Sequence, residues 1–292
     1  MNFKSSMILS TLMLMVASPS VFAIKKEFPD INKKYESGQS TGWPKAARYD
    51  RQVVLTFDDG PDPVLTPKVL DVLKKYNAKA TFFILGKNVS SKTTHIIERM
   101  LKEGHLVASH GTEHHNSNTI TEAVYKQNLK SSVNTLEDVM DSLGYDQKEM
   151  YYRFPYGAFG RGKQYHHLNT MKQVSQEVYG ENCINYAFWD IDTEDWVADM
   201  TPQKIAQNII AYVDGGTYYE HYKDGATWRT RGKQMSNPPG GGIALLHDVK
   251  DKDIQAVEIF LKYAQNNSIE VIPLSQVEGY RYDGKSCERL RK

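Results

Sequence analysis

The stretch VVLTFDDGPDP, residues 53–63, places two adjacent carboxylates, Asp58 and Asp59, where an apolar, β-branched run ends. Successive side chains of a strand point to opposite faces, so both carboxylates can reach one cavity only where the strand stops. Asp, Gly and Pro are also common turn residues, and a turn explains this stretch equally well when it is taken alone. The meaning of the pair therefore depends on the rest of the chain.

The chain of 292 residues is long enough for one large α/β domain or two small ones. Its 36 basic and 35 acidic residues give a formal net charge of +1. Because the sequence contains no basic stripe that could follow a phosphate backbone, we expect no nucleic-acid partner.

Residues 1–23 predict a signal peptide. Lys4 precedes the short apolar run 7–17, and Val21 and Ala23 provide the small residues of a cleavage site after Ala23. The apolar run is shorter than the ~20 residues that span a membrane, and no later stretch of the sequence could span one. We therefore expect an exported, soluble protein, either periplasmic or secreted.

The interpretation of the two cysteines, Cys183 and Cys287, depends on the predicted export. In an oxidising compartment they can form one disulfide that ties the C-terminal tail to the domain. The sequence does not show whether they meet.

Apolar, β-branched runs alternate with amphipathic segments from residue 51 onward. Strands are expected at 52–57, 78–85, 105–110, 151–156, 184–192, 242–248 and 269–274, and helices at 65–76, 93–103, 121–143, 165–179, 202–213 and 253–266. This alternation is typical of parallel βαβ units. It predicts an α/β fold, a distorted (β/α) barrel of about seven parallel strands, although an open doubly wound sheet would show the same alternation.

The expected domain covers residues 51–280, with a polar leader at 24–50 and a C-terminal tail at 281–292. Residues 214–242 form an insertion that is too long and too rich in glycine for an ordinary link from helix to strand. We expect a surface excursion with irregular structure. It could line a substrate groove, or lie at the far end of the barrel, where loops from helix to strand normally lie.

Polar residues stand at the ends of several predicted strands, where parallel α/β barrels carry their functional groups. His110 and His114, four residues apart, would share one face of a helical turn. Two imidazoles and one carboxylate make a three-ligand site with open positions, as in catalytic zinc centres. Only one of the two aspartates is needed as a ligand, and the other could then accept a proton. Two unrelated loop histidines remain the alternative.

Two further charged residues suit such a site. Arg153 could hold a carboxylate bidentately, and Asp195 could pair with His247 and favour its protonated form. A protonated imidazole could donate to a leaving amine. Each charge could instead belong to a surface ion pair. Trp196, Tyr156 and Leu245 could line the pocket, although residues of these types are more often part of a core.

The motifs occur together and in a fixed order: TFDDGPD, HxxxH, RFPY, DTEDW and LLHD. In this order they resemble the five motifs of the polysaccharide deacetylases, the NodB-homology group also called carbohydrate esterase family four. The resemblance spans about residues 51–280. One position departs from the pattern, because Gly111 stands where the family usually has Ser or Thr, and a hydroxyl that supports the metal site in relatives is missing.

The resemblance implies a metal-dependent enzyme that hydrolyses the N-acetyl group of N-acetylglucosamine residues in an extracytoplasmic glycan and releases acetate. Metal-bound water would attack the amide. The residues carried over are Asp58 as general base, Asp59, His110 and His114 as metal ligands, Arg153 as the residue that orients Asp58, His247 as general acid tuned by Asp195, and the Tyr156 N–H as an oxyanion donor. Tyr156, Trp196 and Leu245 would contact substrate. Zinc is the expected metal, with cobalt or nickel as alternatives.

Other functions remain open at this stage. The same residues could hydrolyse O-acetyl esters, as in xylan esterases, or belong to a glycan-binding protein that has lost catalysis. A magnesium-dependent phosphotransfer site is a further alternative, but it would leave the histidines without a role. We expect a monomer that acts on peptidoglycan or chitooligosaccharide, and favour peptidoglycan because the signal peptide looks bacterial.

Overall fold

The computed structural model describes residues 51–159, 166–235 and 240–277, Tyr280, Tyr282 and 286–290. The predicted signal peptide and leader lie outside the described residues. The main sheet is parallel, with the order β5-β4-β3-β2-β1-β9-β6. Its strands are β1 (Gln52–Asp58), β2 (Ala80–Ile84), β3 (Leu106–Ser109), β4 (Tyr151–Tyr152), β5 (Asn185–Tyr186), β6 (Ile191–Asp192) and β9 (Gly241–His247), and the short β10 (Glu270–Val271) also pairs with β1.

The sheet is curled because one chain segment reaches both of its edges. The predicted strand 184–192 is in fact two strands of two residues each, β5 paired with β4 and β6 paired with β9. Residues 187–190, the crossing segment, join the two edges, with the Ala187 N–H donating to Tyr152 and the Asp190 N–H to Ile243. The predicted distorted barrel is therefore confirmed as a curled half-barrel of seven parallel strands.

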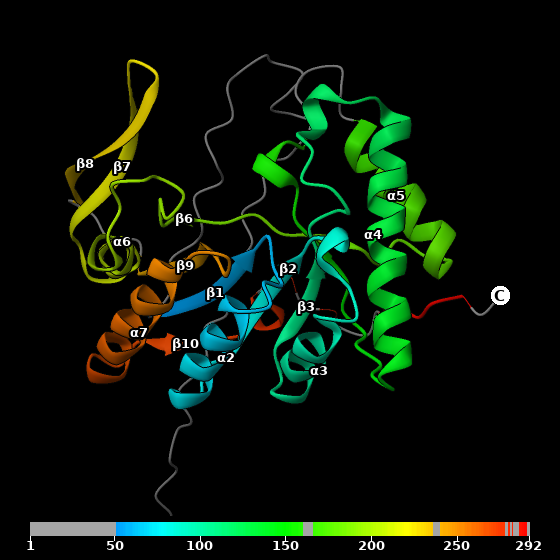
Figure 1. The fold of residues 1–292 in the computed structure, drawn as a ribbon, viewed down its shortest axis with the longest axis horizontal. Coiled ribbons are helices and arrows are strands. Elements are labelled where there is room, and N and C mark those ends of the chain that lie inside the picture. The colour runs from blue at the N-terminus through cyan, green and yellow to red at the C-terminus, as the bar shows by residue number, and fades with distance from the viewer. Residues whose placement is uncertain are drawn as a thin grey trace, which may run out of the picture.

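Helices cover the sheet in the predicted positions to within a residue or two. They are α2 (Leu65–Lys75), α3 (Thr94–Lys102), α4 (Glu122–Ser142), α5 (His166–Tyr179), α6 (Pro202–Asp214) and α7 (Asp251–Asn266), and Figure 1 shows α2, α3 and α7 beside the strands and α4 with α5 at one end. The Thr201 side chain caps α6 by accepting from the Lys204 N–H, just before Pro202. None of the described helices is long and apolar enough to cross a membrane.

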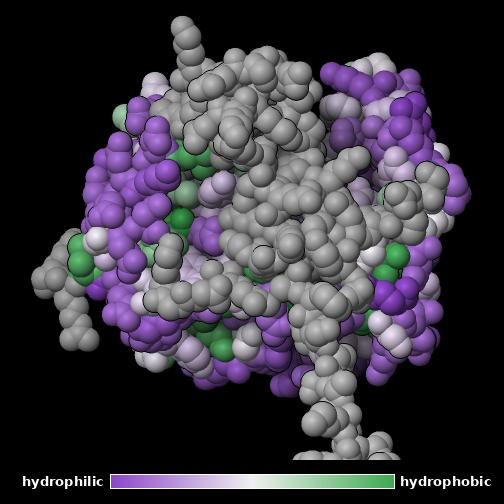
Figure 2. Space-filling model, turned by 180° about the vertical axis from the view of Figure 1, so that it is seen from behind, coloured by the Kyte–Doolittle hydropathy of each residue, from purple (hydrophilic) through white to green (hydrophobic). Residues whose placement is uncertain are grey.

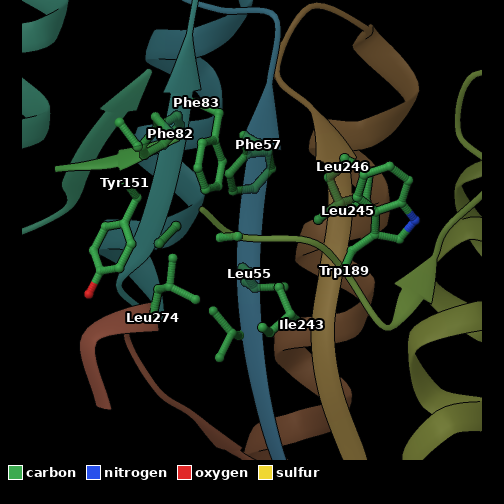
Figure 3. Packing of buried hydrophobic residues seen from close by; sticks show 14 of the residues in the cluster. Leu55, Phe57, Phe82, Phe83, Tyr151, Trp189, Ile243, Leu245, Leu246 and Leu274 are labelled. Atoms are coloured by element: carbon green, nitrogen blue, oxygen red, sulfur yellow. The ribbon is translucent and has the colours of Figure 1, made fainter. Parts of the chain in front are cut away.

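The core lies between the central strands and these helices. All seven residues of β1 and all five of β2 are buried, as expected for parallel strands that are covered on both faces. Figure 3 shows side chains of β1, β2 and β9 packed together, and the rings of Phe57 and Phe82 stack at 5.2 Å between centroids. The coloured surface seen from behind in Figure 2 is mostly hydrophilic, with only small apolar patches. The apolar runs of the sequence are thus buried in the core.

The insertion 214–242 contains a regular β-hairpin, so the prediction of irregular structure was wrong. β7 (Gly216–Asp224) and β8 (Thr227–Met235) pair antiparallel over their whole length, and Gly225 at the tip has φ 58°. Tyr, Thr and Trp favour strands, and the described glycines of the insertion lie at the base and the tip of the hairpin except for Gly232, which is paired with Tyr219. Figure 1 shows the hairpin standing apart from the main sheet, above α6.

Cys183 and Cys287 form a disulfide. The bond joins residues 104 positions apart and attaches the C-terminal tail to the segment that leads into β5. Two backbone hydrogen bonds support the same attachment, from Cys287 to Lys148 and from Leu290 to Val178.

Candidate active site

The three predicted metal ligands meet where β1 and β3 end. Asp59 Oδ1 lies 3.4 Å from His114 Nε2 and 3.6 Å from His110 Nε2. One ligand atom from each residue falls within 4.8 Å of the other two. Asp59 Oδ1 is buried and has no hydrogen-bond partner, which is costly unless another group satisfies it. A divalent cation would satisfy it, so the residues present fit a metal ion.

The two imidazoles have the protonation state that metal ligation requires. His110 Nδ1–H donates to the Arg153 carbonyl oxygen at 2.8 Å, which leaves the lone pair of Nε2 facing Asp59. Burial lowers the pKa of His110 to about 3, and burial also lowers the pKa of His114. Both histidines are therefore neutral at neutral pH and can ligate without first releasing a proton.

The backbone of Asp59 explains how adjacent aspartates reach one cavity. Asp58 is the last residue of β1, and Asp59 has a left-handed conformation with φ 75°. This conformation breaks the alternation of the strand, and a carboxylate oxygen of each aspartate lies 3.6 Å from His110 Nε2. A non-glycine residue with positive φ is strained and is retained mainly where a site requires it.

Arg153 is fully buried and holds Asp58 through a single nitrogen. Nη1 donates to Asp58 Oδ1 and to Thr56 Oγ1, both at 2.8 Å. The expected bidentate contact is absent, because Nε and Nη2 donate to two carbonyl oxygens of the crossing segment, each at 3.1 Å. Asp58 Oδ2 consequently remains directed at the histidines. Burial raises the pKa of Asp58, and the charge of Arg153 opposes this rise.

His247 ends β9, next to Asp58 in the register of the sheet, and is paired with Asp195. His247 Nδ1 lies 2.7 and 2.9 Å from the two oxygens of Asp195, which also accepts from the His247 backbone N–H at 2.8 Å. Burial alone would lower the pKa of His247, but the charge and hydrogen bond of Asp195 raise it to about 9. The Nε2 atom of this protonated imidazole lies 3.9 Å from Asp59 Oδ2.

The residues expected to contact substrate differ in exposure. Tyr156 is 64% exposed, has φ 58°, and its ring centroid lies 4.5 Å from that of His114. Trp196 is 36% exposed, next to Asp195 in the chain. Leu245, in contrast, belongs to the buried core and is only 6% exposed. Tyr156 and Trp196 are therefore the ones available to a ligand.

The backbone conformation at position 111 favours glycine. Its φ is 82°, and a Cβ at this position would collide with Asn128 Oδ1, which accepts from the Thr112 N–H at 2.9 Å. The position thus has no room for the hydroxyl side chain that the family usually carries. The His110 ring is oriented instead by the Arg153 carbonyl described above.

Sequence reasoning missed two buried carboxyl groups next to the site. Asp248 accepts a hydrogen bond from Thr66 Oγ1 and packs so closely on Gly60 that any side chain at position 60 would collide with it. It therefore fixes the loop that follows Asp59. Asp253, in the first turn of α7, is buried, and burial followed by the charge of Asp195 raises its pKa to about 10. The only sequence signal for Asp248 was its place in the LLHD motif.

Residues 45–176 match the family model described as polysaccharide deacetylase. A peptidoglycan-N-acetylglucosamine deacetylase of Listeria monocytogenes is 32% identical over 269 residues, which cover 90% of this chain and 47% of the relative. The chain thus spans about half the length of this relative. A chitooligosaccharide deacetylase of Bradyrhizobium sp. is 27% identical over 228 residues, 78% of this chain and 90% of the relative.

Solved structures also resemble this chain. A family 4 acetyl xylan esterase from Clostridium thermocellum, in complex with a cobalt ion, superposes with a TM-score of 0.55 at 26% identity, covering 77% of this chain and 89% of that chain. Sequence motifs, fold and comparisons agree. The chain belongs to the polysaccharide deacetylase family.

Proposed function

We propose that the chain is a metal-dependent polysaccharide N-deacetylase, which releases acetate from N-acetylglucosamine residues of an extracytoplasmic glycan, peptidoglycan in the first place. One observation carries the proposal: a carboxylate held by Arg153 and an imidazole held by Asp195 flank the ligand cluster of Asp59, His110 and His114. Hydrolysis of an amide needs a base that accepts a proton from water and an acid that donates a proton to the departing amine, and these two residues could fill the two roles.

Asp59, His110 and His114 would hold the metal, which we take to be zinc, with cobalt or nickel as alternatives. When bound, the ion would polarise the acetyl carbonyl and lower the pKa of a water molecule.

Asp58 would accept the proton of the attacking water. Its Oδ1 is fixed by Arg153, and its Oδ2 faces the cluster, so the accepting oxygen is already oriented. Burial raises the pKa of Asp58 and makes it a stronger base, while Arg153 keeps the ionised form accessible.

His247 would donate a proton to the departing nitrogen. Its Nδ1–H is engaged by Asp195, so the proton available for transfer is on Nε2, which faces the cluster. The backbone N–H of Tyr156 would donate to the developing oxyanion. Losing one such donor costs roughly 3–4 kcal/mol in other enzymes, so this N–H would add substantially to the effect of the metal.

The test is acetate release from peptidoglycan, chitooligosaccharides and acetylated xylan, each with and without chelator. We expect release from the two N-acetylated glycans, loss of release after chelation, and recovery on adding zinc or cobalt. Unchanged release after exhaustive metal removal would overturn the metal-dependent mechanism, and release from no N-acetylated glycan would overturn the proposed substrate.

A second candidate is hydrolysis of O-acetyl esters, favoured by the likeness to the C. thermocellum acetyl xylan esterase. An ester has a better leaving group than an amide and needs less help from His247. Faster acetate release from acetylated xylan than from any N-acetylated glycan would favour this candidate.

A further inference from the structure

The hairpin β7–β8 is firmly attached to the loop that carries Asp195. His221 Nδ1 lies 2.8 and 2.9 Å from the oxygens of the buried Glu194, which is one residue before Asp195. Thr230 donates from its N–H and its hydroxyl to Asp199 at 3.1 and 2.9 Å. Further down, Tyr219 exchanges two backbone hydrogen bonds with the amide of Asn208 in α6, at 2.6 and 2.9 Å.

The side chains that make these contacts, those of His221 and Thr230, lie on one face of the hairpin. His221 is paired with Thr230, and Lys223 with Trp228. Since alternate residues of a strand share a face and paired residues point the same way, Tyr219 and Trp228 lie on this face too. The opposite face carries Tyr218, Glu220, Tyr222 and the basic residues of β8, Arg229, Arg231 and Lys233.

The attached face ends in a cluster of three aromatic rings, which we call the platform: Trp196, His221 and Trp228. The ring centroids are 5.0 Å apart for Trp196 and His221, 5.2 Å for His221 and Trp228, and 5.7 Å for the two tryptophans. Trp196 and Trp228 remain 36% and 43% exposed. Two adjacent exposed indoles leave apolar surface in water, and such surface typically marks a binding site.

The platform is continuous with the candidate active site. Trp196 directly follows Asp195, the partner of His247, and Glu194 precedes it. The hairpin is therefore fixed to the same short loop that orients the proposed acid. Because the rings are already in contact with one another and with Glu194, little side-chain freedom would be lost on binding a ligand.

We propose that the platform is a second sugar-binding site, at which Trp228 stacks on a pyranose ring of the glycan chain whose N-acetyl group is being hydrolysed, and Trp196, whose ring plane lies at 78° to that of Trp228, contacts the edge of the same sugar. This inference rests on the proposed function. The C–H face of a pyranose is apolar and flat, which suits an indole, and its hydroxyls remain free for solvent. The Lys223 ammonium lies over the Trp228 ring, 5.7 Å from its centre, and would supply hydrogen-bond donors to the hydroxyls of a sugar bound there. The site would favour long glycans over short ones.

The test compares Trp228→Ala with Tyr222→Ala, which removes an aromatic ring from the opposite face of the same hairpin. We expect Trp228→Ala to raise KM for a chitin hexasaccharide about tenfold, with kcat retained, because an aromatic stacking contact contributes up to ~1.5 kcal/mol. Hydrolysis of a chitin disaccharide and of a small chromogenic acetyl ester should stay at the rate of the unmodified protein. Tyr222→Ala should match the unmodified protein on all three.

A loss that is equal on all substrates would mean that Trp228 only supports the loop around Asp195, and an unchanged KM for the hexasaccharide would also overturn the proposal. Calorimetric binding of the hexasaccharide to the Asp58→Asn protein, with and without Trp228→Ala, separates this inference from the proposed function. If the unmodified protein releases no acetate from any N-acetylated glycan but Trp228→Ala still weakens binding, the proposed function fails and the platform stands.

Discussion

Asp58 and Asp59 are neighbours in the chain, but their carboxylates have different partners. Asp58 Oδ1 is held by Arg153, whereas Asp59 Oδ1 is buried with no donor and faces two neutral imidazoles. A carboxylate with a guanidinium partner is oriented to accept a proton, and one without any donor is suited to bind a cation. These contacts support the proposed roles, with Asp58 as base and Asp59 as metal ligand.

Substituting Asp58 should separate metal binding from turnover. We expect Asp58→Asn to keep its metal and lose about 10²- to 10⁴-fold in kcat, because an amide can accept a hydrogen bond from Arg153 but cannot take the proton. Metal content by mass spectrometry and acetate release measure the two effects, with Asp59→Asn as the matched control that loses the metal. If metal content and turnover fall together in Asp58→Asn, the roles of the two aspartates must be exchanged or shared.

Removing the charge of Asp195 should move the alkaline limb of the pH–rate profile. Asp195 raises the pKa of His247 to about 9, so the imidazole stays protonated, and able to donate, up to that pH. In Asp195→Asn the burial of His247 is no longer opposed by a full charge, and its pKa should fall toward or below the ordinary 6.5. The loss of kcat with rising pH should therefore begin at lower pH.

The control for this profile is Asp224→Asn, which removes an exposed carboxylate paired with Arg229 near the hairpin tip. Its alkaline limb should match that of the unmodified protein. An unshifted limb in Asp195→Asn would show that His247 is not the acid that the profile reports.

At the scale of elements, the sequence predicted the described α-helices and the positions of most parallel strands, because each carries its own apolar periodicity, but it did not predict β7 and β8. It could not predict that 184–192 divides into β5 and β6, since an apolar run shows burial but not which strand it pairs with. The two carbonyl contacts of Arg153 depend on that division, and were missed for the same reason. The glycines of the insertion predict irregular structure, whereas the Tyr, Thr and Trp residues between them favour the strands that the structure contains.

The candidate site was more predictable than these pairings. Its groups stand at or just after the ends of several parallel strands, and parallel topology brings such ends together. The contacts of Glu194 with His221 and of Trp196 with Trp228 could not be predicted, because they depend on how the hairpin is placed on the loop.

The first turn of α7 contains a residue that we expect to lower stability at alkaline pH. The folded-state pKa of Asp253 is about 10, above the ordinary value of 3.8, so the folded protein retains a proton that the unfolded chain releases. Below about pH 3.8 the carboxyl is protonated in both the folded and the unfolded state, so it does not lower the free energy of unfolding. As the pH rises from 3.8 toward 10, only the folded protein keeps the proton, and the free energy of unfolding declines. Asp253→Asn removes this titration.

We therefore expect Asp253→Asn to raise the melting temperature at pH 8 by several degrees and to change it little at pH 4. Asp251→Asn is the control in the same helical turn, because Asp251 is exposed and should shift the melting temperature at neither pH. A variant that melts at the temperature of the unmodified protein at pH 8, or below it, would contradict the assignment of a protonated Asp253.

At the scale of the whole molecule, segments far apart in the chain hold one another. β1 pairs with β9 and β10 from the C-terminal part of the chain, and the disulfide attaches the tail across 104 residues. Of these contacts only the covalent disulfide persists in the unfolded chain, where it closes a long loop and restricts the freedom of the chain. The candidate site at the strand ends is thus built on a domain in which β1 pairs with strands from the C-terminal part of the chain, and the C-terminal tail is held by the disulfide.

Loss of the disulfide should lower the free energy of unfolding by about 2–4 kcal/mol, because the unfolded chain regains the freedom of a long loop. The change is Cys183→Ser together with Cys287→Ser, measured by urea denaturation. Reductant should lower the stability of the unmodified protein by a similar amount and leave the double variant unaffected. Equal midpoints for both proteins under oxidising conditions would show that the bond adds nothing to stability.

At the position of Arg153, selection for stability and selection for activity are expected to favour different residues. A buried ion pair is often replaced by apolar residues of similar volume at no cost in stability, or with a gain. Joint substitution of Arg153 and Asp58 by apolar residues would remove both buried charges and with them the proposed base, although the carbonyl oxygens of the crossing segment would lose their Arg153 donors and offset part of the gain. A library varied at these two positions and sorted for survival after heating should enrich apolar pairs, and the same library sorted for acetate release should return to Arg and Asp. The residue proposed to orient the base is thus one that selection for stability alone is expected to replace.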